Sequence, residues 1–189
     1  MDAGAGLAVL TIGHSTHPIE EFADIIRAYG VELLVDVRTV PKSRHNPQFN
    51  ADALAESLPA AGIGYERMPA LGGLRHPRPD SPNGGWRNDS FRGYADYMQT
   101  EQFADAVDAL LTRARARRTA IMCAEAVPWR CHRSLIADAL LVRSAPVLHI
   151  MSAAAARPHA LHSFARVNGM RITYPPELPS DTPDTGPSS

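Results

Sequence analysis

The stretch TAIMCAEAVPWRCHRSLIADALLV, from Thr119 to Val142, contains an apolar segment, a polar loop and a second apolar segment in succession. The short run from Thr119 to Met122 is typical of a buried strand, and the pattern from Leu135 to Val142 is typical of a helix. Both cysteines of the chain lie between these two elements. A strand–loop–helix unit of this kind is the building block of a parallel sheet.

The same alternation of strands and helices continues on both sides of this stretch. The strand patterns are continuous apolar runs rather than runs that alternate with polar residues. Such runs are typical of parallel strands that are covered on both faces. The sequence therefore predicts an α/β fold, a single three-layer domain with a mostly parallel sheet of about five strands and helices on both faces. Further strands are expected at 7–12, 32–38, 63–68 and 147–151, and helices at 18–29, 51–61 and 102–114.

The chain is expected to divide into three parts. Residues 1–151 are predicted to form the α/β domain, and 152–174 a C-terminal extension that includes a short helix. Residues 175–189 are rich in Pro, Ser and Asp and are predicted to be disordered. The segment 70–88 is crowded with Gly, Pro, Asn and Asp, and a loop of that length is expected to be either functional or disordered.

Composition excludes several classes of function. No apolar run approaches the length of a membrane span, and the N-terminus lacks the features of a signal peptide, so a cytoplasmic protein without a membrane partner is expected. The two cysteines are then expected to be thiols. The formal net charge of −1 gives no reason to expect a polyanion as partner. Arginines are concentrated between 113 and 133, which indicates either a solvated helix end or a patch for phosphate groups.

Polar residues follow three of the predicted strands directly. They are Gly13-His14-Ser15, Asp36-Val37-Arg38 and Cys123-Ala124-Glu125. In parallel sheets the carboxyl ends of the strands lie at one edge, and ligands bind there. These side chains are therefore expected to converge on one crevice. Asp36 and Arg38 are expected to point to opposite faces of their strand and not to form an ion pair with each other.

The cysteine loop is compatible with a nucleophilic thiol. Cys131, His132 and Arg133 are predicted to begin a helix, whose N-terminus binds anions and lowers thiol pKa values. In this hypothesis Cys123 or Cys131 is the nucleophile. Arg130 or Arg133 holds an anionic group of the substrate, and Glu125 or His132 moves protons.

Two other interpretations of the cysteines remain open. Cys123, Cys131 and His132, with Glu125 or His14, contain the atoms that ligate a metal, but neither cysteine has a C-x2-C partner. No metal ligand and no cofactor is assigned on this basis. Alternatively, the thiols are structural, because cysteine is often buried in protein cores. A non-catalytic nucleic-acid binding module that uses the arginines is a further alternative, and the near-neutral charge counts against it.

Several other residues have two interpretations each. His14 and Ser15 either belong to the active site or cap the following helix. Gly72 and Gly73 either allow a close approach of the backbone to a ligand or form a turn. His149 is expected to be a core histidine. Tyr94 and Tyr97 are expected to pack in the core rather than to stack against a flat ligand.

A series of short motifs resembles a known family. In order they are TIGHS at 11–15, LLVDVR at 33–38 with Pro41 and Ser43 after it, LGG at 71–73, YADYM at 94–98, CAE at 123–125, CHR at 131–133 and LHI at 148–150. Together they resemble the bacterial and archaeal family named domain of unknown function 488, from about Leu10 to Ile150. The resemblance implies that the polar strand ends are signature positions of that family, for which no activity is generally established.

The leading hypothesis is an enzyme, a cysteine-dependent transferase or hydrolase that acts on an anionic small molecule, a nucleotide or a nucleic-acid end. The predicted catalytic residues are Cys123, Glu125, Cys131, His132 and Arg133. The predicted substrate-binding residues are His14, Ser15, Asp36, Arg38, Ser43, Gly72, Gly73 and Arg130.

Overall fold

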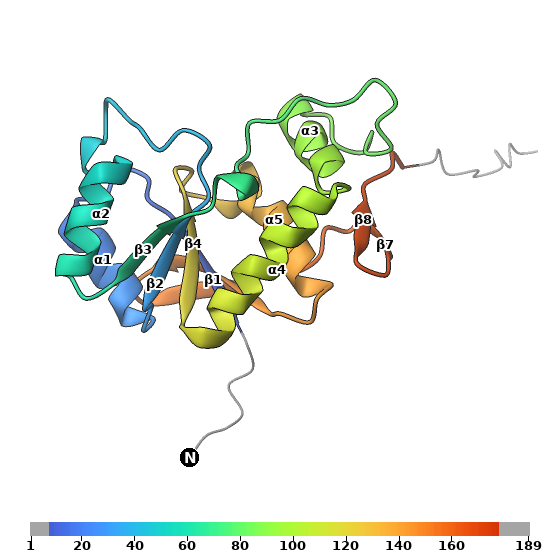
Figure 1. The fold of residues 1–189 in the computed structure, drawn as a ribbon. Coiled ribbons are helices and arrows are strands. Elements are labelled where there is room, and N and C mark those ends of the chain that lie inside the picture. Colours follow the sequence, from blue (N-terminus) through green and yellow to red (C-terminus); the bar gives the residue numbers. More distant parts are fainter. Residues whose placement is uncertain (1–7, 178–189) are drawn as a thin grey trace, which may run out of the picture.

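A six-stranded sheet lies between two layers of helices in the computed structural model, which describes residues 8–177 (Figure 1). The strand order is β3-β2-β4-β1-β5-β6. The first five strands of this order are parallel, and β6 pairs with β5 in the antiparallel direction. The α/β class is confirmed, with one edge strand more than predicted. The strands are β1 (Val9–Gly13), β2 (Leu33–Asp36), β3 (Gly64–Arg67), β4 (Thr119–Cys123), β5 (Val147–Ser152) and β6 (Ala155–Pro158).

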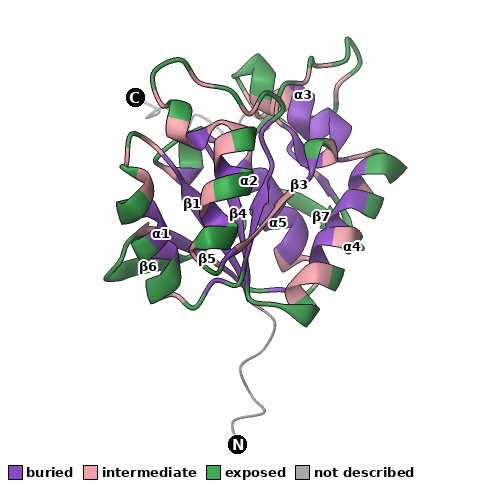
Figure 2. Cartoon of the chain, turned by 60° about the vertical axis from the view of Figure 1, so that its left-hand side comes forward, coloured by how far each residue is buried: buried purple, intermediate pink, exposed green. Residues whose placement is uncertain are grey.

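Helices cover both faces of the sheet and form a separate core on each. On one face the side chains of α1 and α2 pack against alternate strand residues such as Leu34. On the other face α3, α4 and α5 pack against the intervening residues, such as Val35. The strands at the centre are buried on both sides (Figure 2), which explains their continuous apolar runs. The helices are α1 (Ile19–Ala28), α2 (Ala51–Ala60), α3 (Asp89–Tyr97), α4 (Glu101–Ala116) and α5 (Arg133–Leu141).

Helix α3 is absent from the sequence prediction. Its residues are largely polar and include Gly93, so their apolar periodicity is weak. Tertiary contacts stabilise it instead. The Asn88 side chain caps it by accepting hydrogen bonds from two backbone amides of its first turn. Tyr94 and Tyr97 are buried and donate their hydroxyl protons to the carbonyls of Leu71 and Ala70, so they belong to the core as expected.

The long Gly- and Pro-rich loop before α3 is ordered around one carboxylate. Asp96 in α3 accepts hydrogen bonds from the amide of Arg78 at 2.8 Å, from the hydroxyl of Ser81 at 2.6 Å and from the side chain of Asn83 at 2.8 Å. Burial raises the pKa of Asp96, but these hydrogen bonds outweigh burial, and its pKa is lower than usual. The loop is therefore attached to α3 and bends over the carboxyl edge of the sheet.

The C-terminal extension folds as short strands. β6 is followed by a hairpin of β7 (Arg166–Asn168) and β8 (Arg171–Thr173), so the expectation of a short helix here was wrong. The hairpin joins an aromatic cluster in which Trp86 packs against Phe164 and Tyr174. This packing depends on residues that are far apart in sequence. The predicted disordered tail lies outside the described residues from 178 onward.

The helices of residues 8–177 include none that is long and apolar enough to cross a membrane.

Candidate functional site at the carboxyl edge of the sheet

The ends of β1 and β4 form the floor of the candidate site. Gly13 is paired with Cys123 in the sheet, and the amide of His14 donates to the Cys123 carbonyl at 2.9 Å. The chain leaves β1 toward β2 and leaves β4 toward β5, in opposite directions across the sheet. Such a switch point opens a crevice between the two strand ends. Gly13 is required here, because a side chain at this position would overlap the carbonyl of Glu125.

A cavity of about 370 Å³ lies above this floor. It brings together seven of the predicted site residues, which are Arg38, Gly73, Cys123, Glu125, Arg130, Cys131 and His132. Sequence reasoning did not assign the remaining walls to the site, because except for Ala124 they come from loops and a helix start that carry no motif of their own. These additional lining residues are Thr39, Val40, Leu74, Ser90, Phe91 and Ala124.

A second hollow of about 420 Å³ adjoins the first and shares Arg38 and Glu125 with it. It contains three more predicted residues, His14, Ser15 and Ser43. The convergence of polar strand ends expected from the sequence is therefore present. Lys42, which also lines this hollow, was not predicted.

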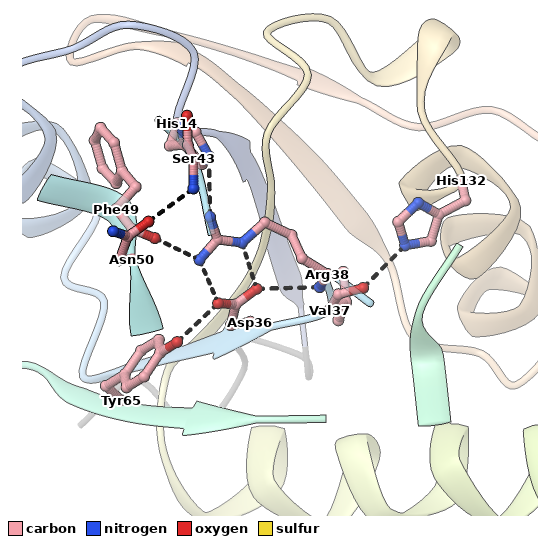
Figure 3. A network of polar contacts seen from close by, with 9 residues as sticks. All are labelled: His14, Asp36, Val37, Arg38, Ser43, Phe49, Asn50, Tyr65 and His132. Carbon is pink, nitrogen blue, oxygen red and sulfur yellow. Dashed lines mark hydrogen bonds and ion pairs between the residues drawn. The ribbon is translucent and has the colours of Figure 1, made fainter. Parts of the chain in front are cut away.

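His132 lies beside both thiols. Its Nδ1 is 3.6 Å from the Sγ of Cys131 and 4.0 Å from the Sγ of Cys123. Its Nε2 is 3.2 Å from the carbonyl oxygen of Val37, at the end of β2 (Figure 3). A carbonyl only accepts, so Nε2 carries a proton. Nδ1 then has one of two states. It either has a lone pair that accepts a thiol proton, or it carries a second proton and donates it to a thiolate.

The pKa values of the two thiols are shifted in opposite directions. The pKa of Cys131 is far below its usual value, because the thiol of Cys123 donates to it and because His132 and Arg133 are close. The pKa of Cys123 is raised, first by its hydrogen bond to Cys131 and then by burial. The contacts of His132 and Arg133 with the Cys131 sulfur favour Cys131 as the thiol that loses its proton first.

Arg133 contacts the cysteine loop from the interior of the protein. It is buried, and all three of its guanidinium nitrogens are bound within the protein. Nε donates to the Cys131 sulfur at 3.4 Å, and the other two nitrogens donate to the hydroxyl of Thr11 at 3.3 Å and to the carbonyl of Glu125 at 2.5 Å. Arg133 does not line the cavity. Its position is that of a residue that holds the cysteine loop rather than one that contacts a substrate.

Asp36 and Arg38 form a buried ion pair (Figure 3), so the expectation that they would not pair was wrong. Nε of Arg38 lies 2.8 Å from one carboxylate oxygen of Asp36, and NH2 lies 2.6 Å from the other. Residues two positions apart along a strand point to the same face, and β2 ends at Asp36, which leaves Arg38 free to fold back. NH2 of Arg38 also donates to the Phe49 carbonyl, and Tyr65 donates its hydroxyl proton to Asp36.

His14 is neutral and orients Arg38. Its Nδ1 donates to the Ser15 carbonyl at 2.8 Å, and its Nε2 accepts from NH1 of Arg38 at 3.2 Å. Its ring stacks on Phe49 at a centroid distance of 4.2 Å. Burial lowers the pKa of His14 to about 4. Neither His14 nor Ser15 caps α1, whose N-cap is Pro18, and Ser15 has a positive φ of 49°, a strained conformation found at functional sites.

Of the other predicted substrate-binding residues, Ser43 and Gly73 line one of the two hollows and Gly72 does not. The Ser43 amide donates to Asn50, and its hydroxyl accepts from the amide of Asn46, so it holds a turn beside the second hollow. Gly73 touches the His132 ring, and a side chain there would approach Nδ1 to 2.5 Å. Gly72 packs against Thr39 and lies outside both hollows.

The arginines near residue 115 are not part of the site. Arg113 and Arg117 both form ion pairs with Glu66 in β3. Arg118 directly precedes β4 and donates to the carbonyl of Tyr29, at the opposite edge of the sheet from the cysteines. The arginine-rich segment was interpreted as either a solvated helix end or a patch for phosphate groups, and these contacts favour the helix end.

Three side chains of the site match a metal-binding set. The sulfur atoms of Cys123 and Cys131 and a ring nitrogen of His132 lie within 4.8 Å of one another. A histidine that ligates a metal usually donates its other ring N–H to a carbonyl, as His132 does to Val37. Two thiolates and one imidazole would leave a fourth position open toward the cavity, as in catalytic zinc sites. His14, which binds Arg38, does not complete this set.

Fold and site together define an α/β protein with a buried thiol pair at a switch point of its parallel sheet. The chain belongs to the family described as Domain of unknown function DUF488, whose model matches residues 18–140. That segment includes both cysteines and the Asp36–Arg38 pair, whereas His14, Ser15 and all residues after Leu140 lie outside it. No curated protein and no solved structure matches the chain.

Proposed function

We propose that the protein is a cysteine-dependent transferase or hydrolase with Cys131 as its nucleophile. The observation that carries this proposal is the environment of the Cys131 sulfur. It accepts a hydrogen bond from Arg133 and lies beside His132, and its pKa is far below the usual value for a thiol, which favours the thiolate. The same sulfur lines the main cavity, so a substrate held there meets an activated nucleophile.

The cavity supports a small anionic substrate. Its volume of about 370 Å³ is that of a small-molecule site. Arg130 is exposed on its rim and has no ion-pair partner among the described residues, so its guanidinium is free to bind a phosphate or carboxylate. The side chains of Val40, Leu74 and Phe91 supply apolar walls. A phosphorylated or carboxylated compound with an apolar or flat body, a nucleotide included, fits this arrangement.

The residues can divide the chemistry into two steps. The Cys131 thiolate forms a bond to the electrophilic atom of the substrate, and the bond to the leaving group breaks. The leaving group keeps that electron pair and takes a proton from Nδ1–H of His132. In the second step water or an acceptor molecule attacks the cysteine adduct, Glu125 on the rim takes its proton, and the thiolate is released.

Alkylation of the native protein at different pH values, with each cysteine mapped by mass spectrometry, tests the proposal. We expect Cys131 to react at pH 6 and Cys123 to react slowly throughout. Inorganic phosphate should slow the reaction of Cys131 if the cavity binds anions. A Cys123→Ser variant controls for the assignment of the signal. Slow reaction of both thiols up to about pH 8.5, the ordinary thiol pKa, would exclude an activated nucleophile.

A metal centre at the same residues is the second candidate, and the spacing of the two sulfurs and His132 favours it. It predicts that both thiols are protected from alkylation until a chelator is added. Addition of Co²⁺ to the stripped protein would then produce a sulfur-to-cobalt absorption band, which Cys131→Ser should remove. Reaction of Cys131 that is equally fast with and without chelator would favour the nucleophile.

A further inference from the structure

A second group of potential ligands lies where α5 meets the C-terminal extension. Asp138 of α5 is fully buried, and two histidines of the extension contact its carboxylate. Nε2 of His159 is 2.8 Å from one carboxylate oxygen, and Nδ1 of His162 is 2.6 Å from the other. The three ligand atoms lie within 4.8 Å of one another. None of these residues belongs to the thiol site, and both histidines lie outside the family match.

The charge of Asp138 is balanced in an unusual way. Its carboxylate accepts hydrogen bonds from His159, His162 and the hydroxyl of Tyr174. Within residues 8–177 neither lysine nor arginine forms an ion pair with it. A metal ion held by the carboxylate and the two ring nitrogens would supply the permanent positive charge that this buried group lacks.

The surroundings of the cluster resemble the outer shell of a metal site. The hydroxyl of Tyr174 donates to Asp138 at 2.7 Å and would orient a ligating carboxylate. Nδ1 of His159, the nitrogen that faces away from Asp138, lies 3.0 Å from Nε2 of His149. Nδ1 of His149 lies 2.7 Å from the hydroxyl of Thr11. The His159 ring is therefore fixed in orientation by a partner on its second nitrogen, as is usual for a ligating histidine.

An open path leads to the cluster. His149, His159 and His162 line a cavity of about 270 Å³ that is separate from the thiol cavity. A tetrahedral Zn²⁺ site separates its ligand atoms by roughly 3.3 Å, given metal–ligand distances of about 2.0–2.1 Å. The present distances of 2.6 and 2.8 Å are to different oxygens of Asp138, and they need to grow by about 0.5–0.7 Å, with a turn of the carboxylate, for an ion to replace the two shared protons.

We infer that Asp138, His159 and His162 bind a divalent transition-metal ion of the Zn²⁺ class, which links α5 to the C-terminal extension. One oxygen of Asp138, Nε2 of His159 and Nδ1 of His162 are the ligands, and the fourth position faces the cavity. Metal binding requires Nε2 of His159 and Nδ1 of His162 to give up their protons. The neutral His162 ring then carries its proton on Nε2. The neutral His159 ring carries its proton on Nδ1, and its hydrogen bond to His149 reverses. His149 in turn changes from its Nε2–H form to its Nδ1–H form and donates to Thr11.

Zinc content of stripped and reloaded protein tests this inference. The Cys123→Ser/Cys131→Ser double variant serves as the starting protein, because it removes the sulfur ligands of the thiol site. We expect it to retain one Zn²⁺ per chain after gel filtration, measured by mass spectrometry of the metal. Adding His162→Ala should abolish retention, whereas His45→Ala, which alters an exposed histidine elsewhere, should not. No bound zinc in the double variant, or equal retention with His162→Ala, would overturn the inference.

A second measurement does not depend on the folding of the His162 variant. Nitrogen-15 spectra of the histidine rings report which ring nitrogen carries the proton. On addition of Zn²⁺ to the double-serine protein, we expect His149 and His159 to change to their Nδ1–H forms. Unchanged ring tautomers at saturating Zn²⁺ would exclude this site, even if zinc bound elsewhere on the chain.

Discussion

Nε of Arg133 donates to the sulfur of Cys131 across 3.4 Å, from a position two residues further along the chain. The other two nitrogens of the same guanidinium bind Thr11 in β1 and the carbonyl of Glu125. One buried cation thus joins the first strand, the loop after β4 and the start of α5. The charge that stabilises the Cys131 thiolate is the same charge that holds the cysteine loop in place.

Replacement of this guanidinium should change the reactivity of Cys131. In Arg133→Met the side chain keeps its apolar bulk but loses the charge and the hydrogen bond to sulfur. We expect the pKa of Cys131 to rise, which moves its alkylation to higher pH and lowers its rate at pH 6. Arg115→Met, on the exposed side of α4, is the matched control. An unchanged pH midpoint in Arg133→Met would show that the arginine does not stabilise the thiolate.

The ion pair between Asp36 and Arg38 should contribute strongly to stability. Asp36→Asn leaves the buried guanidinium of Arg38 without its carboxylate, and breaking a buried pair in this way costs about 3–5 kcal/mol. Urea denaturation measures this loss. Asp24→Asn removes an exposed pair with Arg27 and should cost less than about 1 kcal/mol. Equal losses in the two variants would contradict the predicted role of burial.

Acid should destabilise the protein through two buried histidines. Burial lowers the pKa of His14 and of His149 to about 4, from an ordinary value of 6.5. Both are neutral in the folded protein, whereas the unfolded chain takes up protons as the pH falls below 6.5. The contribution of these two histidines to the free energy of unfolding should therefore be constant above pH 6.5 and decrease between pH 6.5 and 4, by up to about 3 kcal/mol for each histidine.

A variant isolates the contribution of His14. His14→Gln cannot gain a proton, so its free energy of unfolding should depend less on pH between 6.5 and 4 than that of the unaltered protein. His45→Gln, at an exposed position, should keep the original slope. Urea denaturation at several pH values provides the comparison. The prediction is wrong if both variants show the same slope.

Asp96 should keep the loop before α3 closed. Asp96→Ala removes the acceptor for Arg78, Ser81 and Asn83 together. We expect a loss of about 2–4 kcal/mol, as unsatisfied buried donors cost about 1–3 kcal/mol each and water partly replaces the carboxylate. Trypsin should then cleave after Arg75, which is in the same loop and is followed by His76, faster than in Asp105→Ala, which removes an exposed carboxylate from α4. Equal cleavage rates would show that the loop does not depend on Asp96.

The five parallel strands and the place of the site could be predicted from the sequence. Apolar runs such as 33–35 are local signals, because a strand covered on both faces needs every side chain to be apolar. The polar residues at the strand ends converge by necessity, since parallel strands end at one edge of the sheet. That is why Cys123, Arg38 and His14 were expected together, and the two adjoining hollows contain all three.

The partners of those residues could not be predicted in the same way. Asp36 binds Arg38 because β2 ends at Asp36, and that end is set by pairing with β3 and β4. Helix α3 and strands β6 to β8 carry weak local patterns and are stabilised by contacts with distant segments, such as those around Trp86. Residue spacing contains no information on contacts of this kind.

By itself, the sequence determined the α/β class, the strands and the edge of the sheet at which its polar residues meet, because these follow from periodicity and from the geometry of parallel strands. Only the tertiary structure decided that Arg133 faces Cys131 from within the protein and that Asp138 meets two histidines from beyond position 150. Hydrogen bonds act over about 3 Å, so their partners are determined by the packing of elements that are distant in sequence.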